Sequence, residues 1–118
     1  MQLKYTSSIR KRIICLNVET TNFTTNERIA LEELGEPVIE MEKMFKGKYP
    51  VQFSKTIRTG LKLAIRFDGR ENIEEASQAA NEFVEELGEL IRTKMSDLME
   101  TYDDVNFIFD RKNGLTTL

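Results

Sequence analysis

Seven positively charged side chains and no acidic one lie between residues 43 and 66 of this chain. A guanidinium group binds phosphate through two parallel hydrogen bonds and also stacks on flat rings, so arginines in such a run suit a phosphorylated ligand. Like charges repel one another unless an anionic ligand, acidic side chains elsewhere in the fold or water offsets them, and the sequence leaves these alternatives open. The seven residues are Lys43, Lys46, Lys48, Lys55, Arg58, Lys62 and Arg66.

Further residues suited to an anionic ligand lie outside this run. Arg28 falls in the first turn of an expected short helix, where free backbone N–H groups favour an anion. Arg111, Lys112 and Asn113 follow one another in a predicted loop, and Phe109 offers a ring that can stack on a base. Each residue also has an ordinary interpretation as a solvated or core side chain. The candidate ligand-binding residues are Arg28, Arg58, Arg66, Phe109, Arg111, Lys112 and Asn113.

The side chains that carry most enzyme chemistry are missing. The chain has no histidine, which removes the commonest general base and the commonest metal ligand. Cys15 is the only cysteine, so no disulfide forms within the chain and a reducing compartment is expected. Asp103, Asp104 and Asp110 lie close together in sequence, but carboxylates at such places are usually solvated caps. We therefore predict a binding protein rather than an enzyme, with no cofactor and no metal.

Charge is distributed unevenly along the 118 residues. Residues 1–68 hold 12 basic and 8 acidic side chains, a net charge of +4, whereas residues 69–118 hold 5 and 12, a net charge of −7. Long nucleic acid is not expected as a partner, because it would meet the acidic part, which a small anionic ligand in a pocket avoids. No stretch approaches the roughly 18 apolar residues of a membrane span, and no secretory signal is recognisable. The sequence thus predicts one cytoplasmic domain over residues 1–118, without membrane contact.

A hydrophobic period of two predicts an antiparallel sheet. Its clearest part is an amphipathic hairpin, in which residues 51–58 and 61–68 alternate apolar and polar side chains around a turn at Thr59-Gly60. Only Lys55 interrupts the apolar face, and the other face is polar and basic. Further strands are expected at residues 3–6 and 9–18, joined across Ser7-Ser8, and at residues 38–45 and 105–110.

Two helices are predicted from their ends and their period. Thr24 followed three residues later by Glu27 is a capping-box pattern, and Gly35 suits the left-handed position after a last turn, so a helix is expected over residues 25–34. Pro37 is not expected to continue it.

The second helix is long. Asn72 can cap it, and apolar residues recur at a spacing near 3.6 as far as Tyr102, with glutamates on the opposite face. About 30 residues at 1.5 Å each would span roughly 45 Å, more than so small a domain needs. The helix is therefore expected either to break near Gly88 or to project and pack on another chain, which predicts a homo-oligomer.

The order and size of these elements resemble the phage anti-defence "sponges" that counter the Thoeris system. The resemblance rests on residues 24–37 (TTNERIALEELGEP), the basic hairpin and the long acidic helix. It implies a small oligomer that binds cyclic nucleotide signals, including cyclised ADP-ribose, in the host cytoplasm. Such a protein silences the immune effector without cleaving the signal. No ligand-binding residue is transferred from the family.

The sequence as a whole predicts an α+β domain, with a mostly antiparallel sheet of about five or six strands packed against one short and one long helix. The expected function is sequestration of a small phosphate-bearing cyclic nucleotide, to block host antiviral immunity. An alternative is an oligomeric structural or assembly subunit of a phage or mobile element that acts through protein contacts only. A nucleic-acid-binding regulator is a third hypothesis.

Overall fold

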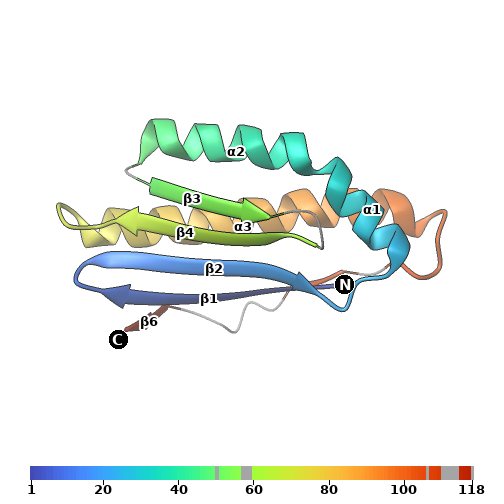
Figure 1. Cartoon of the computed structure of the whole chain (residues 1–118), viewed down its shortest axis with the longest axis horizontal. Helices are drawn as coiled ribbons and strands as arrows, with labels where there is room; N and C mark the ends of the chain where they lie inside the picture. The colour runs from blue at the N-terminus through green and yellow to red at the C-terminus, as the bar shows by residue number, and fades with distance from the viewer. Residues whose placement is uncertain (50, 57–59, 106, 110–114, 118) are drawn as a thin grey trace.

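Four long strands form an antiparallel sheet: β1 (Gln2–Arg10), β2 (Ile13–Thr21), β3 (Val51–Thr56) and β4 (Lys62–Asp68). The computed structural model describes residues 1–49, 51–56, 60–105, 107–109 and 115–117. The strand order is β3-β4-β2-β1, and the short strands β5 (Ile108–Phe109) and β6 (Leu115–Thr117) pair parallel with β1 (Figure 1). The predicted hairpin of β3 and β4 is confirmed, although most of its predicted turn lies outside the described residues.

Helices α2 (Gly35–Lys48) and α3 (Ile73–Met99) pack on one face of the sheet, and α1 (Thr25–Glu33) lies at one end of the molecule against α3 (Figure 1). The ring of Phe83 on α3 is the centre of the core. Its centroid lies 5.2 Å from that of Phe45 on α2, 5.4 Å from that of Phe53 on β3 and 6.5 Å from that of Phe67 on β4. The α+β prediction is confirmed. Among the described residues, no helix is long and apolar enough to cross a bilayer.

The strand predicted over residues 38–45 is wrong, because this segment belongs to α2. Val38, Met41 and Phe45 are all buried, and their spacing of three and four residues is helical. Pro37 is the third residue of α2, in the first turn, where its missing N–H group has no intrahelical acceptor to lose. Gly35 likewise begins α2 instead of closing α1. The described residues therefore form three helices where two were predicted, and four of their strands form the antiparallel sheet.

The turn predicted at Ser7-Ser8 is also wrong. Strand β1 continues to Arg10, which pairs with Ile13, so Lys11 and Arg12 alone form the connection to β2. Both turn residues have positive φ, 52° for Lys11 and 63° for Arg12, the pattern of a type I′ hairpin turn. Asparagine and glycine are the usual residues there, and the Lys-Arg pair gives no such sequence signal. The turn is fixed to the rest of the fold by Gly69, whose N–H group donates to the Arg12 carbonyl at 2.9 Å.

A better turn sequence is expected to stabilise the protein. Changing Lys11→Asn together with Arg12→Gly should raise the free energy of unfolding by about 1–2 kcal/mol, because it relieves left-handed backbone in non-glycine residues. Urea unfolding measures this gain. The matched control, Lys11→Gln with Arg12→Gln, removes the same two charges but keeps the unfavourable backbone. Equal stability of the two variants would show that the backbone at this turn carries no strain.

Helix α3 runs unbroken through 27 residues, about 40 Å at 1.5 Å per residue, in a molecule whose longest extent is 47 Å. The Asn72 side chain accepts a hydrogen bond from the Glu75 N–H group at 3.1 Å, which confirms the predicted cap. Gly88 is buried inside the helix and does not break it. The far half of α3 packs on α1, and Lys94 pairs with Glu33 there. The predicted break is therefore wrong, whereas packing of this half on another chain stays a prediction.

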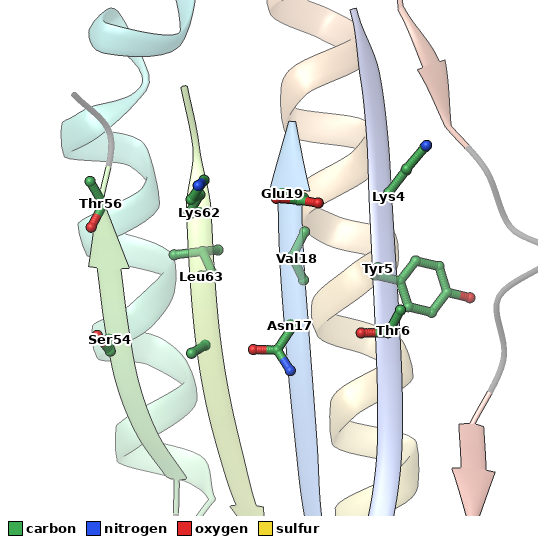
Figure 2. Close-up of a pocket in the computed structure, with 11 residues that line it drawn as sticks. Lys4, Tyr5, Thr6, Asn17, Val18, Glu19, Ser54, Thr56, Lys62 and Leu63 are labelled. Carbon is green, nitrogen blue, oxygen red and sulfur yellow. The ribbon is translucent and has the colours of Figure 1, made fainter. Parts of the chain in front are cut away.

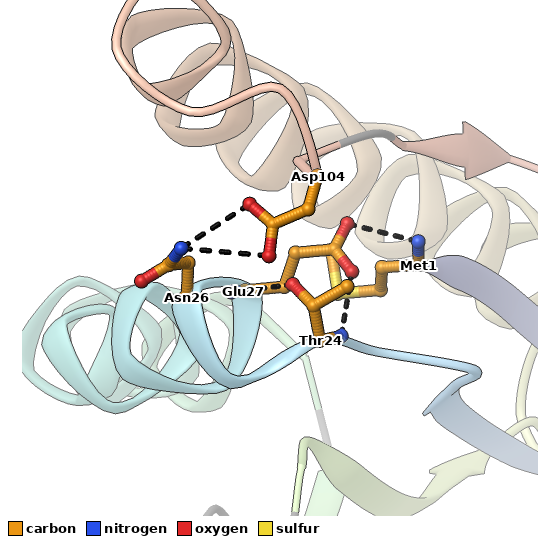
Figure 3. A network of polar contacts seen from close by, with 5 residues as sticks. All are labelled: Met1, Thr24, Asn26, Glu27 and Asp104. Carbon is orange, nitrogen blue, oxygen red and sulfur yellow. Dashed lines mark hydrogen bonds and ion pairs between the residues drawn. The ribbon is translucent and has the colours of Figure 1, made fainter.

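The start of α1 is held by a buried polar network (Figure 3). The predicted capping box is confirmed: Thr24 Oγ1 accepts from the Glu27 N–H group at 3.3 Å, and Glu27 Oε1 accepts from the Thr24 N–H group at 2.8 Å. Glu27 Oε2 lies 2.9 Å from the amino group of Met1, with both side chains buried. Asn26 Nδ2 donates to Asp104 at 3.2 Å, which attaches the segment after α3. This network joins the ends of three elements.

Candidate functional site

No helix formed by the described residues covers the second face of the sheet. Along β4, Leu63, Ile65 and Phe67 are buried against the helices, whereas Lys62 and Arg66 on the other side are exposed. The strand registers place the outward residues of all four strands on this same side, which we call the open face. It consists of Lys4, Thr6, Ser8 and Arg10 of β1; Ile13, Cys15, Asn17 and Glu19 of β2; Gln52, Ser54 and Thr56 of β3; and Lys62, Ala64, Arg66 and Asp68 of β4.

A hollow of about 450 Å³ lies across the four strands of the open face, in the half where β3 ends and β4 begins. Figure 2 shows Lys4 and Lys62 on the two strands that flank Glu19. The next row holds Thr6 and Asn17, together with Ala64 and Ser54. Adjacent strands are about 4.8 Å apart, so the backbones of Lys4 and Lys62 are separated by roughly 10 Å. Volumes of about 300–1,000 Å³ are typical of small-molecule sites, and this hollow combines two cations and the carboxylate of Glu19 with neutral hydrogen-bonding groups.

A second hollow, of about 430 Å³, continues along β3 and β4 and includes Gln52, Arg66, Asp68 and Arg70. Arg70 Nε lies 3.0 Å from both carboxylate oxygens of Asp68, and the Arg70 N–H group donates to the same carboxylate at 3.0 Å. These hydrogen bonds, first that of the Arg70 side chain, lower the pKa of Asp68 to about 2. Arg70 is thus committed to Asp68, and Arg66 is the cation that this hollow offers to a ligand.

The cations of the helix layer are mostly neutralised by their neighbours. Lys43 lies 3.6 Å from Glu40, Lys46 lies 3.0 Å from Glu42, and Lys55 of β3 points under α2 to the same Glu42. Burial raises the pKa of Glu42, but hydrogen bonds from Lys55 and Lys46 outweigh it, so the net shift of this pKa is downward. The positive charge of the basic run is therefore partly compensated. In the helix over residues 35–48, glutamates three or four residues before Lys43 and Lys46 lie next to these lysines.

The charged groups of the open face differ from these. Within the described ranges, no ion pair closer than 4 Å involves Lys4, Glu19, Lys62 or Arg66. The remaining lysine of the run, Lys48, has its ammonium group 5.4 Å from the Tyr49 ring centroid. Three cations without a carboxylate partner among the described residues, Lys4, Lys62 and Arg66, thus line the hollows of this face, where an anionic ligand has direct access to them.

The structure brings few of the predicted site residues together. Arg66 lies on the open face, two residues before the end of β4, and α1 lies at the opposite end of the molecule (Figure 1). Arg28 is on α1, 3.8 Å from Glu32, and the capping box already uses backbone donors at the start of that helix. Phe109 pairs with Leu3 through its backbone in β5. Arg58, Arg111, Lys112 and Asn113 lie outside the described residues.

Several residues of the hollow were not predicted from the sequence. Lys4, Thr6, Asn17 and Ser54 come from three strands, and only the strand order and register show that they are neighbours. Lys62 belonged to the basic run but was not nominated individually. The available signal was the alternation of the hairpin, which places Lys62 on the same face as Arg66.

Comparisons with protein-family models, with curated proteins and with solved structures found no match to this chain. Its function is therefore inferred from the chemistry of the open face. Among the described residues, no group of three or more histidine, cysteine, aspartate or glutamate side chains is placed to hold a metal ion. Of the three aspartates that lie close together in sequence, Asp110 is outside the described residues, and Asp104 accepts a hydrogen bond from Asn26.

Proposed function

We propose that this protein sequesters a small phosphate-bearing cyclic nucleotide on its open face, without chemical change, and so blocks a signal of host antiviral immunity. The observation that carries this proposal is the placement of cations among the described residues: most of those in the helix layer are paired with glutamates, whereas Lys4, Lys62 and Arg66 form no ion pair closer than 4 Å and lie beside two hollows. Phosphate oxygens would pair with these cations, and the hydroxyl and amide groups between them would bind ribose or base.

The proposal is specific about size and charge. A hollow of about 450 Å³ suits a ligand of nucleotide dimensions. A long polyanion would also meet the glutamates of α3, since the chain carries a net charge of −3. A small ligand lies on the sheet alone, in the cytoplasm of the cell that makes the signal. The acidic charge of α3 therefore favours a small ligand over a nucleic-acid duplex.

A thermal-shift screen tests the proposal. The panel contains cyclic dinucleotides, cyclic trinucleotides, cyclised ADP-ribose isomers, NAD, ATP and short single- and double-stranded DNA. A ligand at 100 times its Kd stabilises the native state by about 2.7 kcal/mol, which raises Tm by several degrees in a domain of this size. We expect a large shift with a cyclic nucleotide that is then recovered intact. Recovery of a cleaved product would contradict sequestration, and a flat response would contradict the ligand class.

The alternative function, an oligomeric structural or assembly subunit, is favoured by a different observation. Exposed basic residues at the turn between β1 and β2 and exposed carboxylates along α3 lie on separate parts of the surface. A flat ligand panel combined with self-association would favour this alternative.

A further inference from the structure

The turn between β1 and β2 presents three consecutive cations, Arg10, Lys11 and Arg12, which we call the basic turn. All three are exposed, and no carboxylate of the described residues forms an ion pair with them. Lys11 and Arg12 are held at positive φ, where long side chains are rare. Two cations are thus held in an unfavourable backbone conformation at an exposed turn, and this indicates a binding role.

A groove of about 580 Å³ lies between α3 and Leu34, the residue that joins α1 to α2. Leu34 and Leu90 give it an aliphatic base, and its lining is mostly carbon. Lys94, the one cation among the described residues of the lining, is paired with Glu33. Four carboxylates also line it, of which Glu89 is already paired with Arg92, and together these residues form what we call the acidic groove. The carboxylates are Glu85, Glu86, Glu89 and Asp97.

The two surfaces match in chemistry as well as in charge. Arginine and lysine carry a charged group on a long aliphatic stem, so the stems of the basic turn can lie on Leu34 and Leu90. Their charged ends then reach the carboxylates of the groove, among which Glu86 and Asp97 form no ion pair closer than 4 Å within the described residues. A purely apolar partner would leave the carboxylates desolvated, and a small anion would be repelled by them.

The basic turn cannot reach the acidic groove of its own chain. The Arg12 carbonyl accepts a hydrogen bond from Gly69, which lies four residues before the start of α3, so the turn sits at the beginning of that helix. Glu86 and Asp97 lie 13 and 24 residues beyond Ile73, about 20 and 36 Å along the helix axis. The partner that brings the matching segment is therefore another copy.

We propose that the basic turn of one copy binds the acidic groove of the next, so that copies associate head to tail. The contact joins two different surfaces, and it is therefore heterologous and forms a ring or an open filament. It depends on salt, because its charges lie at the surface. It does not rest on the proposed ligand, since the hollow that contains Lys4 and Lys62 takes no part in it.

Sedimentation velocity tests the contact. The wild-type protein is expected to associate at about 50 mM salt and to dissociate at about 500 mM salt. Lys11→Asn with Arg12→Gly preserves the turn geometry, and Glu86→Gln with Asp97→Asn changes only exposed side chains. Each pair should weaken association at least about 10-fold, a loss expected for several surface charges together. The control, Glu36→Gln with Glu40→Gln, removes two exposed carboxylates outside the groove and should associate as the wild type does.

Mixing the two association-deficient variants gives the decisive result. The turn variant still has an intact groove and the groove variant an intact turn, so a heterologous contact predicts a 1:1 heterodimer that grows no further. Recovery of this heterodimer supports the proposal. Absence of the heterodimer, a wild-type protein that stays monomeric at low salt, or variants that associate like the wild type would each overturn it.

Discussion

Replacement of Glu27 by alanine is expected to lower the free energy of unfolding by about 3–5 kcal/mol, the usual effect of removing one partner of a buried ion pair. Glu27 is fully buried. One carboxylate oxygen lies 2.9 Å from the Met1 amino group, and the other accepts from the Thr24 N–H group at 2.8 Å. The substitution removes the carboxylate from a buried cation and from the start of α1, and it leaves space where the side chain packed.

Urea unfolding of the chain beginning at Met1, without an N-terminal extension, measures this effect. Glu32→Ala is the matched control, because Glu32 is an exposed glutamate on the same helix, 3.8 Å from Arg28. Its loss should change the unfolding free energy by less than about 0.5 kcal/mol. Glu27→Gln should fall between them, since the amide keeps an acceptor for Thr24 but not the charge. Similar losses for Glu27→Ala and Glu32→Ala would contradict the structural role given to this network.

The second large effect concerns the ligand. Lys62→Ala combined with Arg66→Ala is expected to weaken binding of the nucleotide at least about 100-fold, because a hydrogen bond to a charged group contributes about 1.5–3 kcal/mol. Both side chains are exposed, so the stability of the fold should stay close to that of the wild type. Isothermal titration calorimetry measures the affinity, and urea unfolding verifies the stability.

Lys43→Ala with Lys46→Ala provides the control for net charge. It also removes two positive charges, but these two lysines lie on α2 and pair with Glu40 and Glu42. Binding should be unchanged in this variant. An equal loss of affinity in both double variants would mean that overall charge, rather than the open face, attracts the ligand.

The parts of the fold that were predicted correctly have local sequence signals. The alternation of apolar and polar residues identified the strands β3 and β4, and the periodic apolar residues behind Asn72 identified α3. The capping box at Thr24 and Glu27 depends on side chains three residues apart, so it was readable without any tertiary information.

The incorrect predictions arose where two local rules compete. Ile39, Met41 and Phe45 fit a period of two, but Val38, Met41 and Phe45 also fit a helix, and packing of Phe45 on Phe83 decides for the helix. Proline and glycine commonly end a helix, whereas the first turn of α2 contains both. The Lys-Arg turn has no turn-forming residue, so only strand pairing locates it.

The candidate site was only partly predictable, for a geometric reason. Arg66 was found because the hairpin alternation places it on an outward face. Lys4 and Asn17 join the same face through pairings between segments tens of residues apart in sequence. The pairing of Lys43 and Lys46 with glutamates was missed because it requires helical geometry in a segment predicted to be a strand.

Amide chemical-shift mapping by NMR tests the central claim most directly, with the nucleotide that gives the largest thermal shift as the probe. The claim that the open face binds this ligand predicts perturbations along β1, β2, β3 and β4, centred on Thr6, Asn17 and Ala64. The amides in the middle of α3 should stay unchanged, because that helix lies on the other side of the sheet. Perturbations confined to the helices, or none at saturating ligand, would contradict the claim.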